Sequence, residues 1–261
     1  MKDKIGDRMK GYYEDRNRTY LTRRIPVVLR IDGRAFHTFT KGLKKPFDGI
    51  FMNSMIDTTL ELCKNIQGCV IGYTQSDEIS LVLQDYKTLV TDAWFDYNVQ
   101  KMCSIAASMA TTYFNRSFER YVKMYTLGGP ANEYTAVLRR KVDADKFFDC
   151  RCFNIPISEV TNYIYWRQID ARRNSVASCA QSLYSQKELH GKGTSAQIEM
   201  MMEKDFMWEE LPPYQKWGTL CYKVLDEQSG REFWTENLSS PLLIGADRNI
   251  VDSRISFSEE E

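Results

Sequence analysis

Two strand-forming runs separated by only two residues place the tightest constraint on the fold. The first run is Cys69–Thr74 and the second is Asp77–Leu83, with Gln75 and Ser76 between them. Runs of this length joined by so short a connection are typical of a β-hairpin. The sequence therefore predicts an antiparallel strand pair centred near residue 75.

Strand and helix patterns flank this hairpin on both sides. Val27–Asp32 alternates between two faces, as a strand does. Apolar residues then recur at helical spacing after Asp48, a residue type that favours helix N-caps. A long helical pattern runs from about Asp92 to Tyr121, and Phe147–Ile155 is a further strand. The order β-α-β-β-α-β predicts an α+β protein with the ferredoxin-like arrangement of polymerase and cyclase palm domains.

This strand order brings two acids together. In the ferredoxin-like topology the third strand lies between the first two and runs antiparallel to them. The end of the first strand, at Asp32, therefore lies beside the start of the third, at Asp77. Carboxylates are ligands that Mg²⁺ prefers, and two Mg²⁺ ions about 3.5–4 Å apart can activate a hydroxyl and stabilise a leaving pyrophosphate. We predict such a site, with Glu78 as a supporting residue or weak third ligand; the alternative is that both aspartates only cap turns.

The second half of the chain predicts additional helices and a hairpin. Ser158–Ser185 is helical in pattern, and two β-like runs, Gly218–Leu225 and Arg231–Thr235, follow a Pro-Pro pair. We expect residues 1–156 to form the palm-like core with an N-terminal arm. Residues 157–261 would form a helical lobe with a C-terminal hairpin, packed on that core.

Composition excludes several other classes. Seven cysteines without a CxxC pair argue against a disulfide framework or a tetracysteine zinc site, and only two histidines are present. No apolar run approaches the roughly 20 residues that span a bilayer, and the polar start is no secretory signal, so we expect a cytoplasmic protein without membrane contact. Net charge is zero, but residues 1–50 hold 13 Lys and Arg against 6 Asp and Glu. This excess suits a polyanion partner or, alternatively, an ordinary solvated surface.

Phosphate-binding features cluster after the first acid. The backbone amides of Gly33–His37 are candidates for a triphosphate nest, with Gly33 allowing close approach. Lys45 and Lys101 are candidate phosphate contacts, and Phe36 or His37 could support a base. A simple turn would explain the same residues.

Three arginines on the predicted helix 158–185 suit a nucleic-acid backbone or a 5′-phosphate. They are Arg167, Arg172 and Arg173. The alternative is a solvent-facing helix in which Asp170 pairs with them.

In these residues the sequence resembles the tRNA-His guanylyltransferase family, from about residue 5 to residue 225. The matching segments are Arg30–His37, Lys45–Pro46, Gly72–Glu78, Phe148–Asp149 with Arg151, and Trp166–Gln168 with Asp170. The resemblance implies a polymerase-like core that extends RNA in the 3′-to-5′ direction and assembles as a homotetramer. ATP or GTP would activate a tRNA 5′-monophosphate, and the 3′-hydroxyl of an incoming nucleotide would then attack that end, releasing AMP or pyrophosphate.

The resemblance also implies roles for residues. Asp32, Asp77 and the Gly33 carbonyl resemble the metal ligands, and Glu78 the accompanying acid. With the lysines named above, the expected nucleotide-binding set is Gly33, Arg34, Ala35, Phe36, His37, Lys45, Ser76 and Lys101. The expected tRNA-binding set is Arg30, Arg167, Arg172 and Arg173.

One departure from the family shapes the functional expectation. Eukaryotic members that add an untemplated guanosine carry His-Ile-Asn-Asn-Leu-Tyr-Asn where this chain has Arg172–Ser178. This form is similar to the bacterial and archaeal-type branch, which prefers templated addition. We therefore expect template-dependent repair of 5′-truncated tRNA, chiefly by addition of G. The alternatives are untemplated addition to tRNA-His, a nucleotide cyclase, and a non-catalytic RNA-binding protein.

Overall fold

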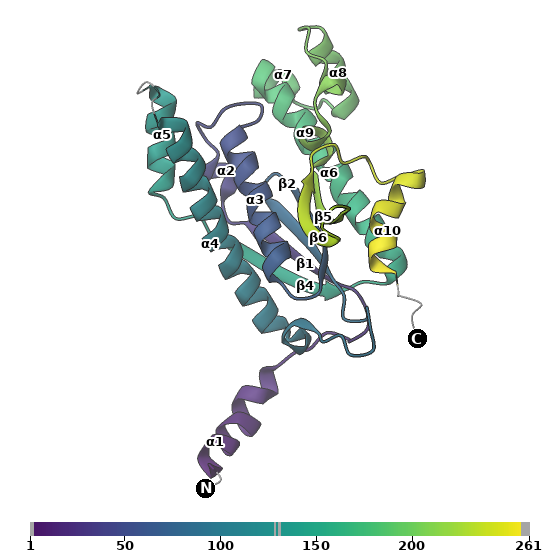
Figure 1. The fold of residues 1–261 in the computed structure, drawn as a ribbon. Helices are drawn as coiled ribbons and strands as arrows, with labels where there is room; N and C mark the ends of the chain where they lie inside the picture. Colours follow the sequence, from purple (N-terminus) through teal and green to yellow (C-terminus); the bar gives the residue numbers. More distant parts are fainter. Residues whose placement is uncertain (1–2, 128, 130–131, 257–261) are drawn as a thin grey trace.

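One six-stranded antiparallel sheet forms the centre of the molecule (Figure 1). The computed structural model describes residues 3–127, 129 and 132–256. The strand order is β4-β1-β3-β2-β5-β6. The strands are β1 (Val27–Gly33), β2 (Cys69–Gln75), β3 (Glu78–Leu83), β4 (Phe148–Asn154), β5 (Thr219–Asp226) and β6 (Arg231–Asn237).

Helices surround this sheet. The α-helices are α1 (Lys4–Met9), α2 (Phe36–Phe39), α3 (Gly49–Asn65), α4 (Val99–Thr126), α5 (Glu133–Val142), α6 (Ile157–Leu183), α7 (Gln186–Leu189), α8 (Thr194–Met202), α9 (Pro213–Trp217) and α10 (Asn249–Ile255). Shorter π or 3₁₀ segments are η1 (Lys10–Glu14), η2 (Asp15–Asn17), η3 (Trp94–Tyr97), η4 (Trp208–Glu210) and η5 (Gly245–Arg248). Among the described residues, no helix is both long and apolar enough to cross a membrane.

The predicted βαββαβ arrangement is confirmed. β3 lies between β1 and β2 and is antiparallel to both, and β4 joins the outer side of β1. The predicted C-terminal hairpin also forms, but β5 pairs with β2, with Tyr73 opposite Leu220. The hairpin therefore extends the core sheet. This pairing satisfies backbone groups that β2 would otherwise expose as an edge strand. The division of the chain at residue 156 stays a prediction.

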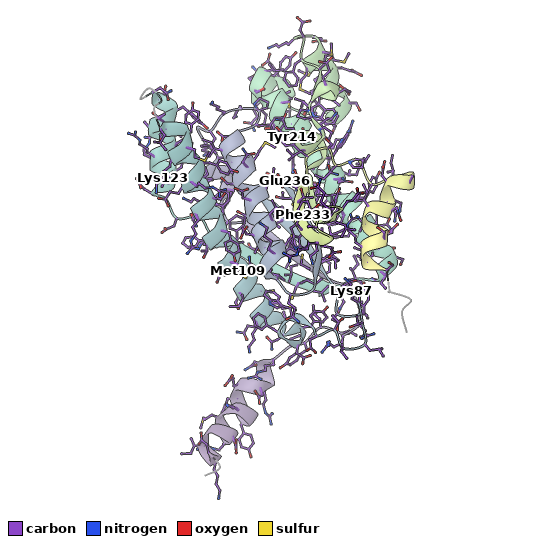
Figure 2. The ribbon with its side chains drawn as sticks, viewed as in Figure 1. Lys87, Met109, Lys123, Tyr214, Phe233 and Glu236 are labelled. Carbon is purple, nitrogen blue, oxygen red and sulfur yellow. The ribbon has the colours of Figure 1, made fainter. Side chains whose placement is uncertain are left out.

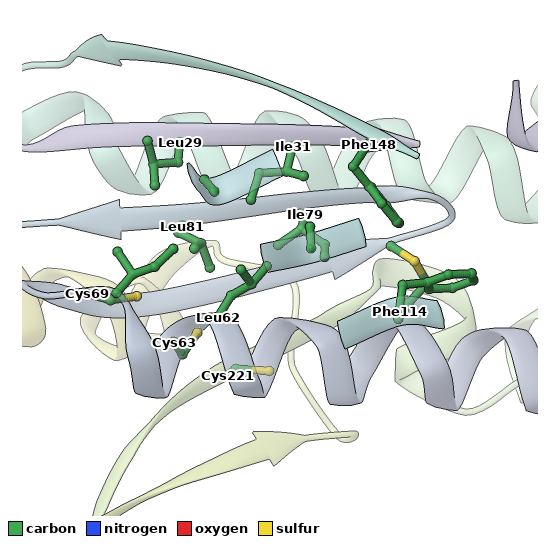
Figure 3. Close-up of a cluster of buried hydrophobic side chains, with 14 of the residues drawn as sticks. Leu29, Ile31, Leu62, Cys63, Cys69, Ile79, Leu81, Phe114, Phe148 and Cys221 are labelled. Atoms are coloured by element: carbon green, nitrogen blue, oxygen red, sulfur yellow. The ribbon is translucent and has the colours of Figure 1, made fainter. Parts of the chain in front are cut away.

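The sheet buries side chains on both faces. Leu29 and Ile31 of β1 face the core that α3 and α4 cover, whereas Val28 faces the core that α6 and α10 cover. Figure 3 shows the first of these cores, with Leu62 of α3 beside the strands and Phe114 of α4 near Phe148. The alternation of β1 thus produces a three-layer structure, because both faces of its strand are apolar.

Local signals explain where the two long helices of the first core begin. The Asp48 carboxylate accepts hydrogen bonds from the amides of Ile50 and Phe51, so the predicted N-cap of α3 is correct. α4 begins at Val99, later than the predicted start near residue 92. Asn98 caps this helix, and the three residues before it, 95–97, have positive φ angles that helical backbone does not adopt.

The N-terminal arm lies away from the rest of the molecule (Figure 1). It consists of α1, η1 and η2, none of which contains a buried residue. The arm leads to the start of β1 through an isolated β-bridge between Tyr20 and Asn98. Its exposed apolar side chains include Ile5 and Tyr12.

Candidate active site

The end of β1 and the β2–β3 turn meet at one end of the sheet. Asp32 is paired in register with Glu78, and the Gly33 amide donates a hydrogen bond to the Asp77 carbonyl at 3.0 Å. The strand order therefore brings Asp32 and Asp77 together, as the topology predicted. The Asp32 side chain is 36% exposed and the Asp77 side chain is half-buried.

This arrangement leaves Asp77 in a setting that disfavours its charge. Burial raises the pKa of Asp77, and the negative charge of Asp32 raises it further. The Ser76 hydroxyl, 3.1 Å from the Asp77 carboxylate, and the nearby His37 oppose that shift. A divalent cation between the two carboxylates would remove the conflict, because it favours both ionised forms.

The donor set fits Mg²⁺ better than a metal held entirely by side chains. In the described part of the chain, no three His, Cys, Asp or Glu side chains are grouped so that they could hold a metal ion. Mg²⁺ is commonly bound by one or two carboxylates, with water and substrate phosphates as its other ligands. Asp32 and Asp77 supply that number of carboxylates.

The backbone of the loop from Gly33 to His37 turns tightly and packs closely against the Phe36 ring. A Cβ atom at Gly33 would lie 2.5 Å from the Phe36 ring, and Ala35 has a φ of 57°. The amides of Gly33 and Arg34 already donate to the carbonyls of Asp77 and Phe147. Of the five backbone amides predicted to bind a triphosphate, only those of residues 35–37 therefore remain candidates. They lie at the start of α2, where the amides of the first turn have no intrahelical partners.

Phe36 is a core residue, which corrects its predicted role in supporting a base. Its side chain is 2% exposed. Its ring packs against Phe39, Phe51, Phe114 and Phe148, with centroid separations of 5.0–6.0 Å. Burial against these rings leaves the aromatic face unavailable to a nucleotide. The neighbouring Arg34 and His37 side chains are exposed and remain candidates.

A cavity of about 240 Å³ opens next to the two acids. Ser76 connects the two features, because it lines the cavity and its hydroxyl contacts Asp77. Lys45, whose side chain is exposed, lies on the wall. Other lining residues come from the loop before α3, from α3 itself, and from β2, α6 and α9; they include Phe47, Met55, Gln75, Asn174, Ser178 and Tyr214 (Tyr214 is labelled in Figure 2).

Glu78 lies at the centre of a buried ion-pair network. Its carboxylate accepts two hydrogen bonds from Arg167, at 2.7 and 2.9 Å, and one from Arg30 at 2.6 Å. Burial raises the pKa of Glu78, while the two arginines oppose the rise. Glu78 faces α6, which carries Arg167. Both carboxylate oxygens are already paired, and the supporting role of Glu78 stays a prediction.

The same network corrects two of the predicted tRNA contacts. The Arg167 side chain is 4% exposed and pairs with both Glu78 and Asp170. Arg30 is also largely buried and pairs with Glu78. The Arg167 guanidinium is withdrawn from solvent and the Arg30 side chain is 22% exposed, and both neutralise the buried Glu78 carboxylate.

The two remaining arginines of α6 are more accessible. Arg172 lies over the Trp208 ring, 5.4 Å from its centroid, and is half-buried. Arg173 is exposed and forms an ion pair with Asp170. These two therefore remain candidates for tRNA contact.

Lys101 is not brought to this site within the chain, contrary to its predicted role. The hydroxyl of Thr111, ten residues further along α4, accepts a hydrogen bond from the amide of Phe148, which pairs with Gly33. At a rise of about 1.5 Å per residue, Lys101 lies about 15 Å further along the helix. It lies near Asn98 and Phe95, at the other end of the sheet.

Sequence reasoning gave no role to two residues that the fold brings here. The Arg151 guanidinium on β4 lies 3.9 Å from the Asp32 carboxylate and 3.3 Å from Asp149. Asn174 of α6 donates a hydrogen bond to Gln75 at 3.3 Å, on the cavity wall. The pairing of β4 with β1 is the signal that could have indicated Arg151; nothing in the local sequence indicates Asn174.

Comparison with known proteins adds a family to this geometry. A family model described as tRNAHis guanylyltransferase matches residues 6–156, more than half of the chain. A probable tRNA(His) guanylyltransferase of Dictyostelium discoideum is 27% identical over 226 residues, covering 81% of this chain and 80% of the relative.

Solved structures agree in fold. A bacterial tRNA(His) guanylyltransferase (Thg1)-like protein in complex with ATP is 36% identical, with a TM-score of 0.82 over 97% of this chain and 100% of that one. Its complex with GTP has a TM-score of 0.78 at 35% identity, over 97% and 99% of the two chains. The enzyme of Saccharomyces cerevisiae is 22% identical, with a TM-score of 0.63 over 87% of this chain and 96% of that one, and shares the fold.

Proposed function

Because the chain belongs to the tRNA-His guanylyltransferase family, we propose that it is a Mg²⁺-dependent nucleotidyltransferase that adds nucleotides, chiefly G, to the 5′ end of tRNA. Growth of the RNA would run in the 3′-to-5′ direction. The observation that carries the proposal is the meeting of Asp32 and Asp77 beside a cavity of about 240 Å³. That combination suits a bound nucleoside triphosphate whose phosphates reach a metal-binding acid pair.

Asp32, Asp77 and the Gly33 carbonyl are the groups that would hold Mg²⁺. The ion supplies Lewis-acid stabilisation of charge on phosphoryl oxygens when bound. The partly exposed Asp32 faces incoming substrate, while the hydrogen bond from Ser76 orients the more buried Asp77. Arg151 lies close enough to Asp32 to neutralise part of its charge or to contact a phosphate.

The nucleotide would lie between the loop and the cavity. The amides of residues 35–37 and the exposed Lys45 suit the triphosphate, because both present positive potential to phosphate oxygens. The cavity wall combines apolar side chains such as Met55 with the polar side chains of Gln75 and Asn174, which suits a base. The complexes of the bacterial relative with ATP and with GTP support both nucleotides as substrates.

Two phosphoryl-transfer steps account for growth at a 5′ end. In the first step the tRNA 5′-monophosphate attacks the α-phosphate of ATP, pyrophosphate leaves, and an activated 5′ end forms. In the second step the 3′-hydroxyl of GTP attacks the tRNA 5′-phosphorus, AMP leaves, and the added nucleotide keeps its own triphosphate. Both steps place negative charge near Asp32 and Asp77, so neither acid can serve there without a cation.

Template-dependent addition is supported by the segment that departs from the eukaryotic block. Ser175 and Ser178, which stand where the eukaryotic block has asparagines, line the cavity, and the Ser178 hydroxyl donates to the Pro46 carbonyl at 2.8 Å. The residues that differ from the untemplated enzymes therefore contribute to the proposed nucleotide pocket. The likeness to the bacterial relative over 97% of the chain supports the same assignment.

The decisive experiment uses a tRNA that lacks its 5′-terminal nucleotide and carries a 5′-monophosphate. The full-length protein is incubated with this RNA, labelled GTP, ATP and Mg²⁺, and the 5′ ends are mapped by primer extension. Two tRNA variants differ only in the 3′-strand nucleotide opposite the gap, C or A. We expect G to be added opposite C, and addition opposite A to be at least about 10-fold slower, the cost of about 1.4 kcal/mol of lost pairing.

Equal addition opposite C and A would overturn the template-dependent assignment in favour of untemplated transfer. Absence of any 5′ extension across several tRNAs would overturn the nucleotidyltransferase proposal itself. A cyclic nucleotide formed without RNA would identify a cyclase instead.

A further inference from the structure

Three cysteines from two distant parts of the chain gather between α4 and β4. Cys103 lies near the start of α4, while Cys150 and Cys152 lie two residues apart on β4 and so share one face of the strand. The Sγ atoms of Cys103 and Cys152 are 3.6 Å apart. Both strand cysteines pack against the core that α4 covers, so they face the helix.

This cluster is more accessible than the other thiols. Cys103, Cys150 and Cys152 are half-buried, whereas Cys63, Cys69, Cys179 and Cys221 are buried. β4 is an edge strand of the sheet, so within the described residues no further strand covers the cluster on that side. A small oxidant can therefore reach the three thiols without unfolding the core.

The three thiols differ in chemistry. A hydrogen bond from Cys150 lowers the pKa of Cys103, with a further contribution from Cys152, although burial opposes the shift. The pKa values of Cys150 and Cys152 are raised. Because the thiolate is the nucleophilic form, Cys103 is the most reactive member and its two neighbours remain thiols.

We propose that Cys103 and Cys152 form a peroxide-oxidisable dithiol, in which Cys103 reacts with hydrogen peroxide and Cys152 resolves the product as a disulfide. The Cys103 thiolate attacks a peroxide oxygen, the O–O bond breaks, and hydroxide leaves to form water with the thiol proton. The Cys152 sulfur then attacks the sulfenic acid, the S–O bond breaks, and a second water leaves. Two thiols are oxidised by two electrons and one peroxide is reduced to two waters.

The geometry favours Cys152 over Cys150 as the resolving residue. A disulfide needs an S–S separation of about 2.05 Å, so the Sγ atoms of Cys103 and Cys152 must approach by about 1.5 Å from their separation of 3.6 Å. The Cys150 thiol, which hydrogen-bonds to Cys103, also lies 3.7 Å from the carbonyl of Arg151 and so has a second acceptor for its proton. A soft-metal site is not the better assignment, since no metal-holding group of three such side chains is found over the described ranges.

The pairing can be read directly by peptide mapping of the full-length protein. Trypsin cleaves after Arg151, which separates Cys150 and Cys152, and Cys103 falls in the peptide 102–116. The protein is treated with hydrogen peroxide, blocked with N-ethylmaleimide, digested without reductant and analysed by mass spectrometry. We expect peptide 102–116 joined to peptide 152–167, and loss of that species after treatment with dithiothreitol.

Three single variants provide matched controls. Cys103→Ser and Cys152→Ser should lose the linked species, whereas Cys150→Ser should keep it. Before oxidation, iodoacetamide should modify Cys103 at least about 10-fold faster than the buried Cys179, because burial in apolar surroundings suppresses thiolate formation. Melting curves of the reduced variants check that each one folds.

The wild-type map decides the proposal even if a variant fails to fold. A disulfide between Cys103 and Cys150 would overturn the choice of resolving residue. Peroxide treatment that leaves both Cys103 and Cys152 as free thiols would overturn the site as a whole.

Discussion

The surroundings of Asp77 disfavour its ionised form, although the proposed binding of Mg²⁺ needs an ionised carboxylate there. Burial and the charge of Asp32 both raise its pKa. The folded state therefore holds a proton more tightly than the unfolded chain does. Stability from this group is present below the ordinary carboxyl pKa of about 3.9 and is lost as pH rises through the higher folded-state pKa. At neutral pH the ionised side chain lowers the stability of the fold.

The substitution Asp77→Asn should therefore raise the melting temperature at pH 7 in the absence of Mg²⁺, because it removes an opposed charge. The same variant should lose at least about 100-fold in the rate of 5′ addition, since a carboxylate ligand worth several kcal/mol of transition-state stabilisation is gone. Melting curves with and without Mg²⁺ and single-turnover addition assays measure both effects. Mg²⁺ should stabilise the natural protein more than the variant.

Asp149→Asn is the matched control, because Asp149 lies opposite Asp32 in the neighbouring strand but is 63% exposed. It should change the rate of addition by less than about 3-fold, since exposed ion pairs contribute about 0–1 kcal/mol. Near-normal addition by Asp77→Asn, or an equal loss in both variants, would contradict the metal-ligand assignment.

Arg167 neutralises the buried carboxylate of Glu78, and a buried charge destabilises the fold when its partner is removed. The substitution Arg167→Met should lower the free energy of unfolding by about 3 kcal/mol, because it removes one of the two partners of buried Glu78. Arg173→Met should change it by less than about 1 kcal/mol, since Arg173 is exposed. Urea denaturation of both variants measures the difference; equal effects would show that Glu78 does not need Arg167.

At the scale of elements, α6 connects the core to the proposed nucleotide pocket. Its first half packs Ile164 into the core on one face of the sheet and directs Arg167 to Glu78. Its second half contributes Asn174 and Ser178 to the cavity wall. One continuous helix thus sets the distance between the ion-pair network and the pocket, because a helix has a constant rise per residue.

A matched pair of substitutions one turn apart tests that wall. Ser178→Leu should fill part of the cavity and raise the KM for GTP at least about 10-fold, equivalent to about 1.4 kcal/mol of binding. Ser182→Leu, on an exposed position outside the cavity, should leave KM within about 2-fold. Steady-state kinetics with saturating tRNA measure both. An unchanged KM in a folded Ser178→Leu variant would place the nucleotide elsewhere.

At the scale of the whole molecule, charge is balanced in total but not in distribution. The net formal charge is zero, yet residues 1–50 hold 13 basic and 6 acidic residues. A polyanion must therefore bind through local patches, and such binding releases counterions. We expect the affinity for tRNA to fall at least about 100-fold between 50 and 200 mM salt, as it does for proteins with several phosphate contacts.

Filter binding or fluorescence anisotropy across a salt series measures the slope of the logarithm of tRNA affinity against the logarithm of salt concentration. Arg173→Ala should lower the slope by about one unit if Arg173 contacts a phosphate. Affinity that does not change with salt would show that tRNA is held by contacts other than phosphate pairing.

The exposed N-terminal arm is relevant to assembly. Because family resemblance implies a homotetramer, we propose that the arm, which buries none of its own residues, contributes to a subunit contact. Light scattering should give four times the chain mass for the full-length protein. Deletion of residues 1–17 should reduce that mass without lowering the melting temperature of the subunit core; an unchanged mass would exclude the arm from the contact.

Sequence alone determined the features that depend on local signals and on general rules of topology. Alternating and helical periodicities gave the βαββαβ order, Asp48 marked the start of α3, and antiparallel pairing placed Asp32 beside Asp77. These inferences held because neighbouring residues and chain-crossing rules decide them.

Only the tertiary structure decided which side chains remain available. Phe36 and Arg167 are residue types that often contact nucleotides or RNA. Packing buries the Phe36 ring among other aromatic rings, and the Arg167 guanidinium forms an ion pair with Glu78. The length of α4 carries Lys101 about 15 Å along the helix from Thr111, to the other end of the sheet from the acids, and β5 closes the free edge of β2. Burial, pairing and separation depend on surfaces that meet only after the chain has folded, so no local pattern could indicate them.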